Sequence, residues 1–108
     1  MNINSTLHNG YRILEVRDHV GLHTELTELL PHIEQALQNK ETNIALSFTD
    51  ESYLSSSAIK VLLQCYEMIT ENDGTLTLLH PNKDIISTFK VLDLEKIIKV
   101  FSSLEELQ

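Results

Sequence analysis

Three consecutive serines, Ser55, Ser56 and Ser57, have the type and position that most favour chemistry in this sequence. They follow a short apolar run and precede a stretch with apolar residues at helical spacing, so we expect them at the start of a helix. The first turn of a helix has unpaired backbone N–H groups and a partial positive charge, which favour a phosphate added to a serine there. On spacing alone, a helix N-cap is the favoured explanation for one serine, but a cap does not account for three.

The histidines and the cysteine are weaker candidates. His19 and His23 are four residues apart, which would place them on one helix face, but they lie at a predicted loop-to-helix boundary with no acidic third ligand. We interpret them as surface histidines and predict no metal. Cys65, the single cysteine, falls on an apolar helical stripe and is interpreted as a core thiol. The sequence has no phosphate-binding glycine loop, nucleophile elbow or Ser-His-Asp spacing, so neither an enzyme activity nor a cofactor is predicted.

The charge balance restricts the partners. The 108 residues include 8 Lys and Arg against 16 Asp and Glu, a formal net charge of −8. Such a surface repels phosphate, which argues against direct binding to nucleic acid or to an anionic membrane. The first ten residues lack the basic and apolar regions of a signal peptide, and no apolar run approaches the roughly 20 residues that span a bilayer. We therefore expect a cytoplasmic protein without membrane insertion.

The elements that must position the serines follow from hydropathy periodicity. Alternating or apolar runs predict strands at residues 3–7, 11–16, 43–48, 75–79 and 97–101. Asn9 and Gly10 predict a two-residue turn that joins the first two strands into a hairpin.

Helical spacing predicts three helices, and a capping pattern predicts a short fourth. The first has an apolar stripe from Leu22 to Leu37, and Pro31 requires this helix either to start late, with the proline in its first turn, or to kink. The second follows Ser57 and is expected to end at Asn72-Asp73-Gly74 with a C-terminal glycine stop. The third contains Ile85, Phe89 and Leu92, and a short fourth helix covers residues 102–106.

The resulting order, β-β-α-β-α-β-α-β-α, predicts an α/β fold. Strands separated by single helices imply right-handed crossovers and parallel pairing. We expect a single domain over residues 1–108, with a mixed, mostly parallel sheet of four or five strands and helices mainly on one side. Sites in such sheets gather at the carboxyl ends of the strands, where the three serines fall.

Residues 53–63, Tyr-Leu-Ser-Ser-Ser-Ala-Ile-Lys-Val-Leu-Leu, resemble a stretch of the STAS domain, the fold of bacterial anti-sigma factor antagonists. In that family the stretch reads aromatic-apolar-Asp-Ser-Ser-Gly-Leu-x-x-Leu-Leu. The likeness continues through residues 74–79, Pro81 and residues 94–106, and it follows nearly the whole chain in element order. This sequence departs from the family pattern at five positions: the family's Asp is replaced at Gly21, Ser47 and Ser55, and its Gly at Ala58 and Asp93.

The resemblance implies a non-enzymatic switch protein. Members of the family bind a serine kinase of the histidine-kinase-like ATPase fold, which is also the anti-sigma factor, and a metal-dependent serine phosphatase reverses its action. The kinase phosphorylates one serine at the start of the second helix, which on the family pattern is Ser56. The residues expected at the partner-binding surface are Asp50, Glu51, Tyr53, Ser55, Ser56, Ser57 and Lys60. The alternative is a STAS subunit of a transporter-accessory or stress-signalling assembly that is not phosphorylated.

Overall fold

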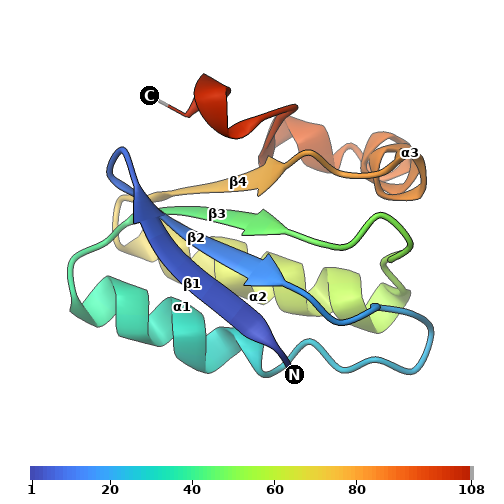
Figure 1. Ribbon diagram of the computed structural model, residues 1–108, viewed down its shortest axis with the longest axis horizontal. Coiled ribbons are helices and arrows are strands. Elements are labelled where there is room, and N and C mark those ends of the chain that lie inside the picture. The colour runs from blue at the N-terminus through green and yellow to red at the C-terminus, as the bar shows by residue number, and fades with distance from the viewer. Residues whose placement is uncertain (108) are drawn as a thin grey trace.

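The computed structural model describes residues 1–107 and contains one five-stranded sheet, with the strand order β1-β2-β3-β4-β5 (Figure 1). The first two strands are antiparallel, and the remaining neighbours are parallel. The strands are β1 (Ile3–His8), β2 (Tyr11–Val16), β3 (Asn43–Ser47), β4 (Thr75–Leu79) and β5 (Lys99–Phe101). The expected α/β fold with a mixed, mostly parallel sheet is therefore confirmed.

The predicted hairpin is also confirmed. His8 pairs with Tyr11, and the two residues between them, Asn9 and Gly10, have φ angles of 48° and 82°. Both angles lie in the left-handed region that a two-residue hairpin turn requires and that Asn and Gly adopt most easily. This turn fixes the register of β1 against β2.

Helices cover one face of the sheet. The helices are α1 (Leu29–Gln38), α2 (Ser56–Glu71) and α3 (Lys83–Val91). Figure 1 shows α1 and α2 side by side beneath the strands, and these two helices bury apolar side chains against them. Leu14, Leu46 and Leu78 are neighbours in the register of β2, β3 and β4, and all three are buried in this main core.

The first helix begins later than its apolar stripe suggests. Pro31 is the third residue of α1, so the late start is the observed alternative and no kink occurs. A proline has no N–H to donate to the carbonyl four residues earlier, which is that of Thr27, and its ring would clash with that carbonyl. Two leucines of the apolar stripe lie in the loop before this helix. Leu26 is buried there, whereas Leu22 is 62% exposed.

The turn after α2 corrects the expected glycine stop. The residue in the left-handed conformation is Asp73, with φ 59°, and not Gly74. Gly74 is required for a different reason: a Cβ built on it would overlap the backbone carbonyl oxygen of Thr42. Its N–H donates to the carbonyl of Ile69 at 2.9 Å, which closes the end of the helix.

The C-terminal third has shorter elements than expected. The 3-10 helix η1 (Leu94–Lys96) occupies the region before β5, and Ile98 donates to the carbonyl of Leu94 at 2.8 Å, so the strand begins only at Lys99. Helix α3 buries Ile85 and Phe89 but ends before Leu92, which is half exposed.

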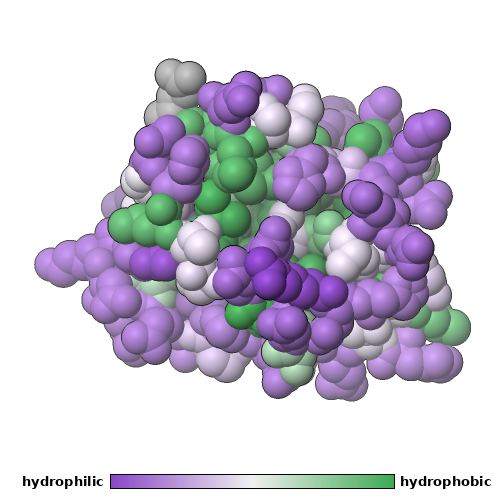
Figure 2. All heavy atoms as spheres, in the orientation of Figure 1, coloured by the Kyte–Doolittle hydropathy of each residue, from purple (hydrophilic) through white to green (hydrophobic). Residues whose placement is uncertain are grey.

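The opposite face of the sheet is covered in part by the end of the chain. The expected last helix is a single 3-10 turn, η2 (Leu104–Glu106), and Leu107 after it is fully buried against Ile13, Ala45 and Leu79. Figure 1 places this turn on the side of the sheet away from α1 and α2, and Figure 2 shows apolar atoms between it and the hairpin. None of the helices within residues 1–107 has the length and apolar character of a bilayer span.

Candidate functional site

The three serines occupy different positions at the start of α2. Ser55 is the N-cap, with extended backbone, and its Oγ accepts a hydrogen bond from the N–H of Ala58 at 3.3 Å. Ser57 lies 3.1 Å, Oγ to Oγ, from the same cap hydroxyl. Ser56 is the first helical residue and is exposed, and within residues 1–107 its hydroxyl makes no hydrogen bond. The role of helix N-cap therefore belongs to Ser55, and the Ser56 hydroxyl remains available for modification.

The loop that leads into the serines is anchored to the loop after β2. The Ser52 hydroxyl is fully buried, accepts from the N–H of Val20 at 2.8 Å and lies 2.7 Å from the Thr49 hydroxyl. The N–H of Tyr53 donates to the carbonyl of Val20 at 2.9 Å. The loops that follow β2 and β3 are thus joined, and together they form one surface next to the N-terminus of α2.

Asn82 ties the same loop to the start of α3. Its side-chain amide lies within hydrogen-bond distance of three loop carbonyls: those of Thr49 at 3.3 Å, Asp50 at 3.0 Å and Ser52 at 2.6 Å. Its Oδ1 accepts from the N–H of Ile85 at 2.9 Å and caps α3. The position of Asn82 before a helix could have indicated the cap, but the sequence carries no signal for the contacts to a loop 30 residues away.

Two large apolar side chains are exposed beside this loop. Tyr53 is 39% exposed, and a Cβ built on buried Gly21 would lie 3.7 Å from its ring. The residue after Gly21 is Leu22, the 62% exposed leucine that the stripe assigned to a helix core. The apolar part of the surface therefore includes Leu22. The sequence did not predict this leucine at the partner-binding surface.

A groove of about 280 Å³ runs between α2 and the loop before α1. Ser57 and Lys60 line it from the helix, and Glu25 and Thr27 line it from the loop. Lys60 is four residues after Ser56, so the two side chains lie on one face of the helix. Of the remaining expected residues, Asp50 and Glu51 are exposed on the loop that Asn82 holds.

The other chemical candidates lie away from this surface or beneath it. Cys65 is fully buried in the core, as predicted, and burial raises the pKa of its thiol to about 12. His19 lies beside Gly21, and a Cβ built on that glycine would be 3.3 Å from the Nε2 atom of the histidine. Across residues 1–107, no three His, Cys, Asp or Glu side chains converge as metal ligands would.

Comparison with known proteins agrees with this fold. The family model described as STAS domain matches residues 3–107. An NMR structure of protein TM1081 aligns with a TM-score of 0.79 and 17% identity, covering 94% of this chain and 82% of that one. A crystal structure of a candidate anti-sigma factor antagonist, TM1081 from Thermotoga maritima, aligns with a TM-score of 0.76 and 15% identity, covering 96% of this chain and 89% of that one. A search of curated proteins gives no match.

Proposed function

The chain belongs to the STAS domain family, and from this membership we propose that it is an anti-sigma factor antagonist switched by phosphorylation of Ser56. Its partners are a serine kinase of the histidine-kinase-like ATPase fold, which is also the anti-sigma factor, and a metal-dependent serine phosphatase. The protein itself acts by binding, as one domain, in the cytoplasm, and it performs no catalysis. The observation that carries the proposal is the exposed, unbonded hydroxyl of Ser56 within residues 1–107, at the N-terminus of α2.

The local chemistry favours a phosphate on Ser56 over one on either neighbour. Ser55 would lose its cap if its Oγ were esterified, because that oxygen accepts the N–H of Ala58. Ser57 lines the groove shared with the loop before α1, and a phosphate on its Oγ would disturb the 3.1 Å contact with the Ser55 hydroxyl. A kinase that approaches the exposed end of α2 meets the Ser56 hydroxyl without breaking any contact of the fold.

A phosphate on Ser56 is compatible with the folded protein. It carries about −1.5 to −2 charge, and the first turn of a helix stabilises negative charge through its N–H groups and its dipole. Lys60, four residues later on the same face, adds a positive charge within reach of that phosphate. We therefore expect phosphorylation to change the binding surface and not the fold.

Two departures from the family pattern preserve this arrangement. The family's Asp before the phosphorylated serine is replaced by Ser55, and both residue types are strong N-caps, so the start of the helix is kept. The family's Gly after the serines is replaced by Ala58, which is buried and introduces no bulky group at the surface.

The surface available to the kinase has an apolar centre and a polar border. Tyr53 and Leu22 are the exposed apolar side chains next to the anchored loop. Exposed aromatic and aliphatic side chains of this kind act as anchors in protein interfaces, with polar groups around them. Asp50, Glu51, Ser55, Ser57 and Lys60 supply that border.

The decisive experiment is incubation of the protein with its cognate kinase and ATP, followed by mapping of the modified residue by mass spectrometry. We expect phosphate on Ser56. Ser56→Asp should mimic the dissociated state and weaken kinase binding by a few kcal/mol, because an unpaired charge must be desolvated in the interface. Ser56→Ala should keep binding in the presence of ATP.

Ser57→Ala is the matched control, since it removes a hydroxyl one residue away and should neither mimic the dissociated state nor prevent release of the kinase in the presence of ATP. Phosphate on Ser55 or Ser57 would refute the assignment of Ser56. Tight binding without any phosphate transfer would instead favour the unphosphorylated subunit of a larger STAS assembly.

A further inference from the structure

The strand β1 has one edge that no part of residues 1–107 covers. In the two-residue hairpin, the closing pair His8–Tyr11 exchanges both backbone hydrogen bonds, and such pairs then alternate along the strands. Asn2 fits this alternation, since its carbonyl accepts from the N–H of Arg17 at 2.9 Å. The residues between, Ile3, Ser5 and Leu7, therefore direct their N–H and C=O groups away from β2.

The free edge of β1 carries none of the usual protection against pairing. Its six residues include no Lys, Arg, Asp, Glu or Pro, whereas exposed edges are normally shortened, charged or interrupted by proline. The opposite edge of the sheet is protected in this way, because β5 has three residues and begins with Lys99. The two edges of one sheet thus differ in how they resist a further strand.

We propose that two copies of this chain associate through their β1 strands, antiparallel about a two-fold axis at Ser5. In that register Ser5 faces Ser5 of the second copy, and Ile3 faces Leu7 in both directions. All three outward-facing residues of each copy then form hydrogen-bonded pairs, and the two sheets become one of ten strands. A second copy is the occupant we propose, because the two-fold axis satisfies the same backbone groups on both chains and brings two acidic molecules together at a strand without Lys, Arg, Asp or Glu.

The side chains and the net charge agree with this pairing. Leu7 is 59% exposed, and the pairing would place it beside partly buried Ile3 of the second copy. The acidic chain repels itself elsewhere, but β1 contains no charged residue. A pocket of about 210 Å³ lies between the strand and α1 and is lined by Ser5, Arg12 and residues of α1.

Cysteine substitution tests the register directly. Paired Cα atoms at Ser5 would be about 5.5 Å apart, within the range of a disulfide. Ser5→Cys should therefore give a covalent dimer under mild oxidation. Leu7→Cys is the matched control, since the two Leu7 positions would lie four residues apart, roughly 14 Å. Native Cys65 does not compete, because it is buried.

Cross-linking of both variants to the same extent, or of neither, overturns the register.

Solution mass tests the association without cysteine. At high micromolar concentration the native chain should show about twice its 12.3 kDa mass by light scattering. Ser5→Pro should return it to the monomer, because it removes an outward N–H that the hairpin itself does not use. Ser5→Ala keeps that N–H and should remain dimeric. Circular dichroism checks that each variant is folded, and a native protein that stays at 12.3 kDa at every concentration overturns the proposal.

Discussion

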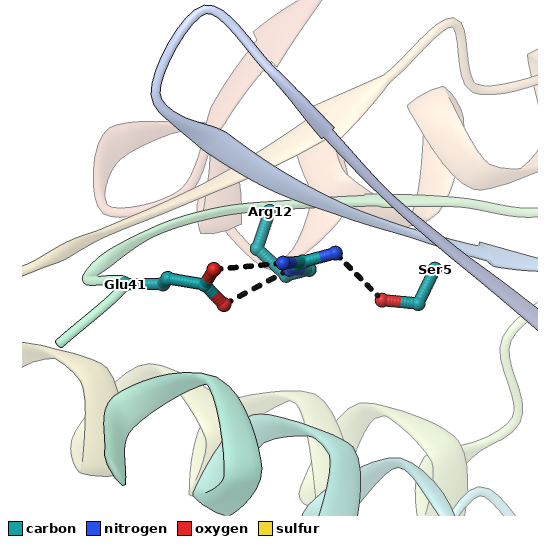
Figure 3. A network of polar contacts seen from close by, with 3 residues as sticks. All are labelled: Ser5, Arg12 and Glu41. Atoms are coloured by element: carbon teal, nitrogen blue, oxygen red, sulfur yellow. Dashed lines mark hydrogen bonds and ion pairs between the residues drawn. The ribbon is translucent and has the colours of Figure 1, made fainter. Parts of the chain in front are cut away.

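Arg12 and Glu41 form a bidentate ion pair between β2 and the turn after α1. The guanidinium donates from Nε to Oε1 at 3.0 Å and from Nη2 to Oε2 at 2.7 Å, and each side chain is only about one-fifth exposed (Figure 3). The hydrogen bond from Arg12 holds the pKa of the Glu41 carboxyl below its ordinary value of 4.5. A carboxyl whose pKa is lowered by folding adds stability above its unfolded pKa, and this contribution is lost as the pH falls through the folded pKa.

We expect Glu41→Gln to lower the free energy of unfolding by about 1 kcal/mol at pH 7, since the pair is bidentate and both side chains are mostly buried. The difference from the native chain should shrink as the pH falls below 4.5. Glu15→Gln is the control, because the Glu15–Arg17 pair is exposed and should contribute close to nothing. Urea denaturation at several pH values measures both. An equal, pH-independent loss in the two variants would contradict the assignment.

At the residue scale, the sequence indicates the serines but does not distinguish their roles. Any of Ser55, Ser56 and Ser57 has the chemistry to cap a helix, and the choice depends on which residue adopts extended backbone before the first turn. The structure assigns that backbone to Ser55. Leu22 is a harder case, since its spacing is helical and only the folded loop shows that it is exposed.

Asn82 acts at the scale of elements, because one side chain joins the β3–α2 loop to α3. Asn82→Asp would keep an oxygen for the N–H of Ile85 but would remove the amide donors and place a negative charge near the carbonyls of Asp50 and Ser52. We expect a loss of about 1 kcal/mol in unfolding free energy, the net value of a typical hydrogen bond, because these carbonyls are only partly buried and that of Thr49 still accepts from the N–H of Ser52. We also expect faster amide exchange in residues 49–55, measured by hydrogen-exchange mass spectrometry.

Asn82→Ser separates the two roles of the residue. A serine retains the helix cap but is too short to hold the loop carbonyls, so the loop should loosen without the added charge repulsion. Its exchange rate should fall between those of the native chain and Asn82→Asp. Unchanged protection of residues 49–55 in the aspartate variant would show that the loop is held by Ser52 and Val20 alone.

Element types follow from the sequence better than element ends do. The hairpin register is local, because Asn9 and Gly10 determine it, and it is predicted correctly. The start of α1 depends on what Pro31 excludes, and the sequence leaves two alternatives. The glycine after α2 is required by a close approach to Thr42, a contact across the sheet that no local pattern contains.

At the scale of the whole molecule, the parallel pairing and the placement of the helices follow from the pattern of crossovers, but the covering of the second sheet face does not. Single helices between parallel strands place α1 and α2 on one side, as expected. The opposite face is apolar at Ile13, Ala45 and Leu79, and the chain covers it with its own C-terminal turn. A lone leucine near the end of a sequence gives no indication that it closes a second core.

Leu107 should therefore matter far more than its near-terminal position suggests. It is fully buried against the second sheet face, and its carbonyl accepts from the Asn9 side chain at 3.2 Å. Leu107→Asp should detach the turn and lower the free energy of unfolding by about 2 kcal/mol, the value of burying one leucine. Leu104→Asp is the control, since that leucine is 42% exposed and its substitution should cost less than about 0.5 kcal/mol. Urea denaturation measures the two losses, and binding of an apolar dye should rise in the Leu107 variant alone, because Ile13 and Leu79 become accessible. Equal losses in the two variants would mean that the turn, and not the leucine, covers this face.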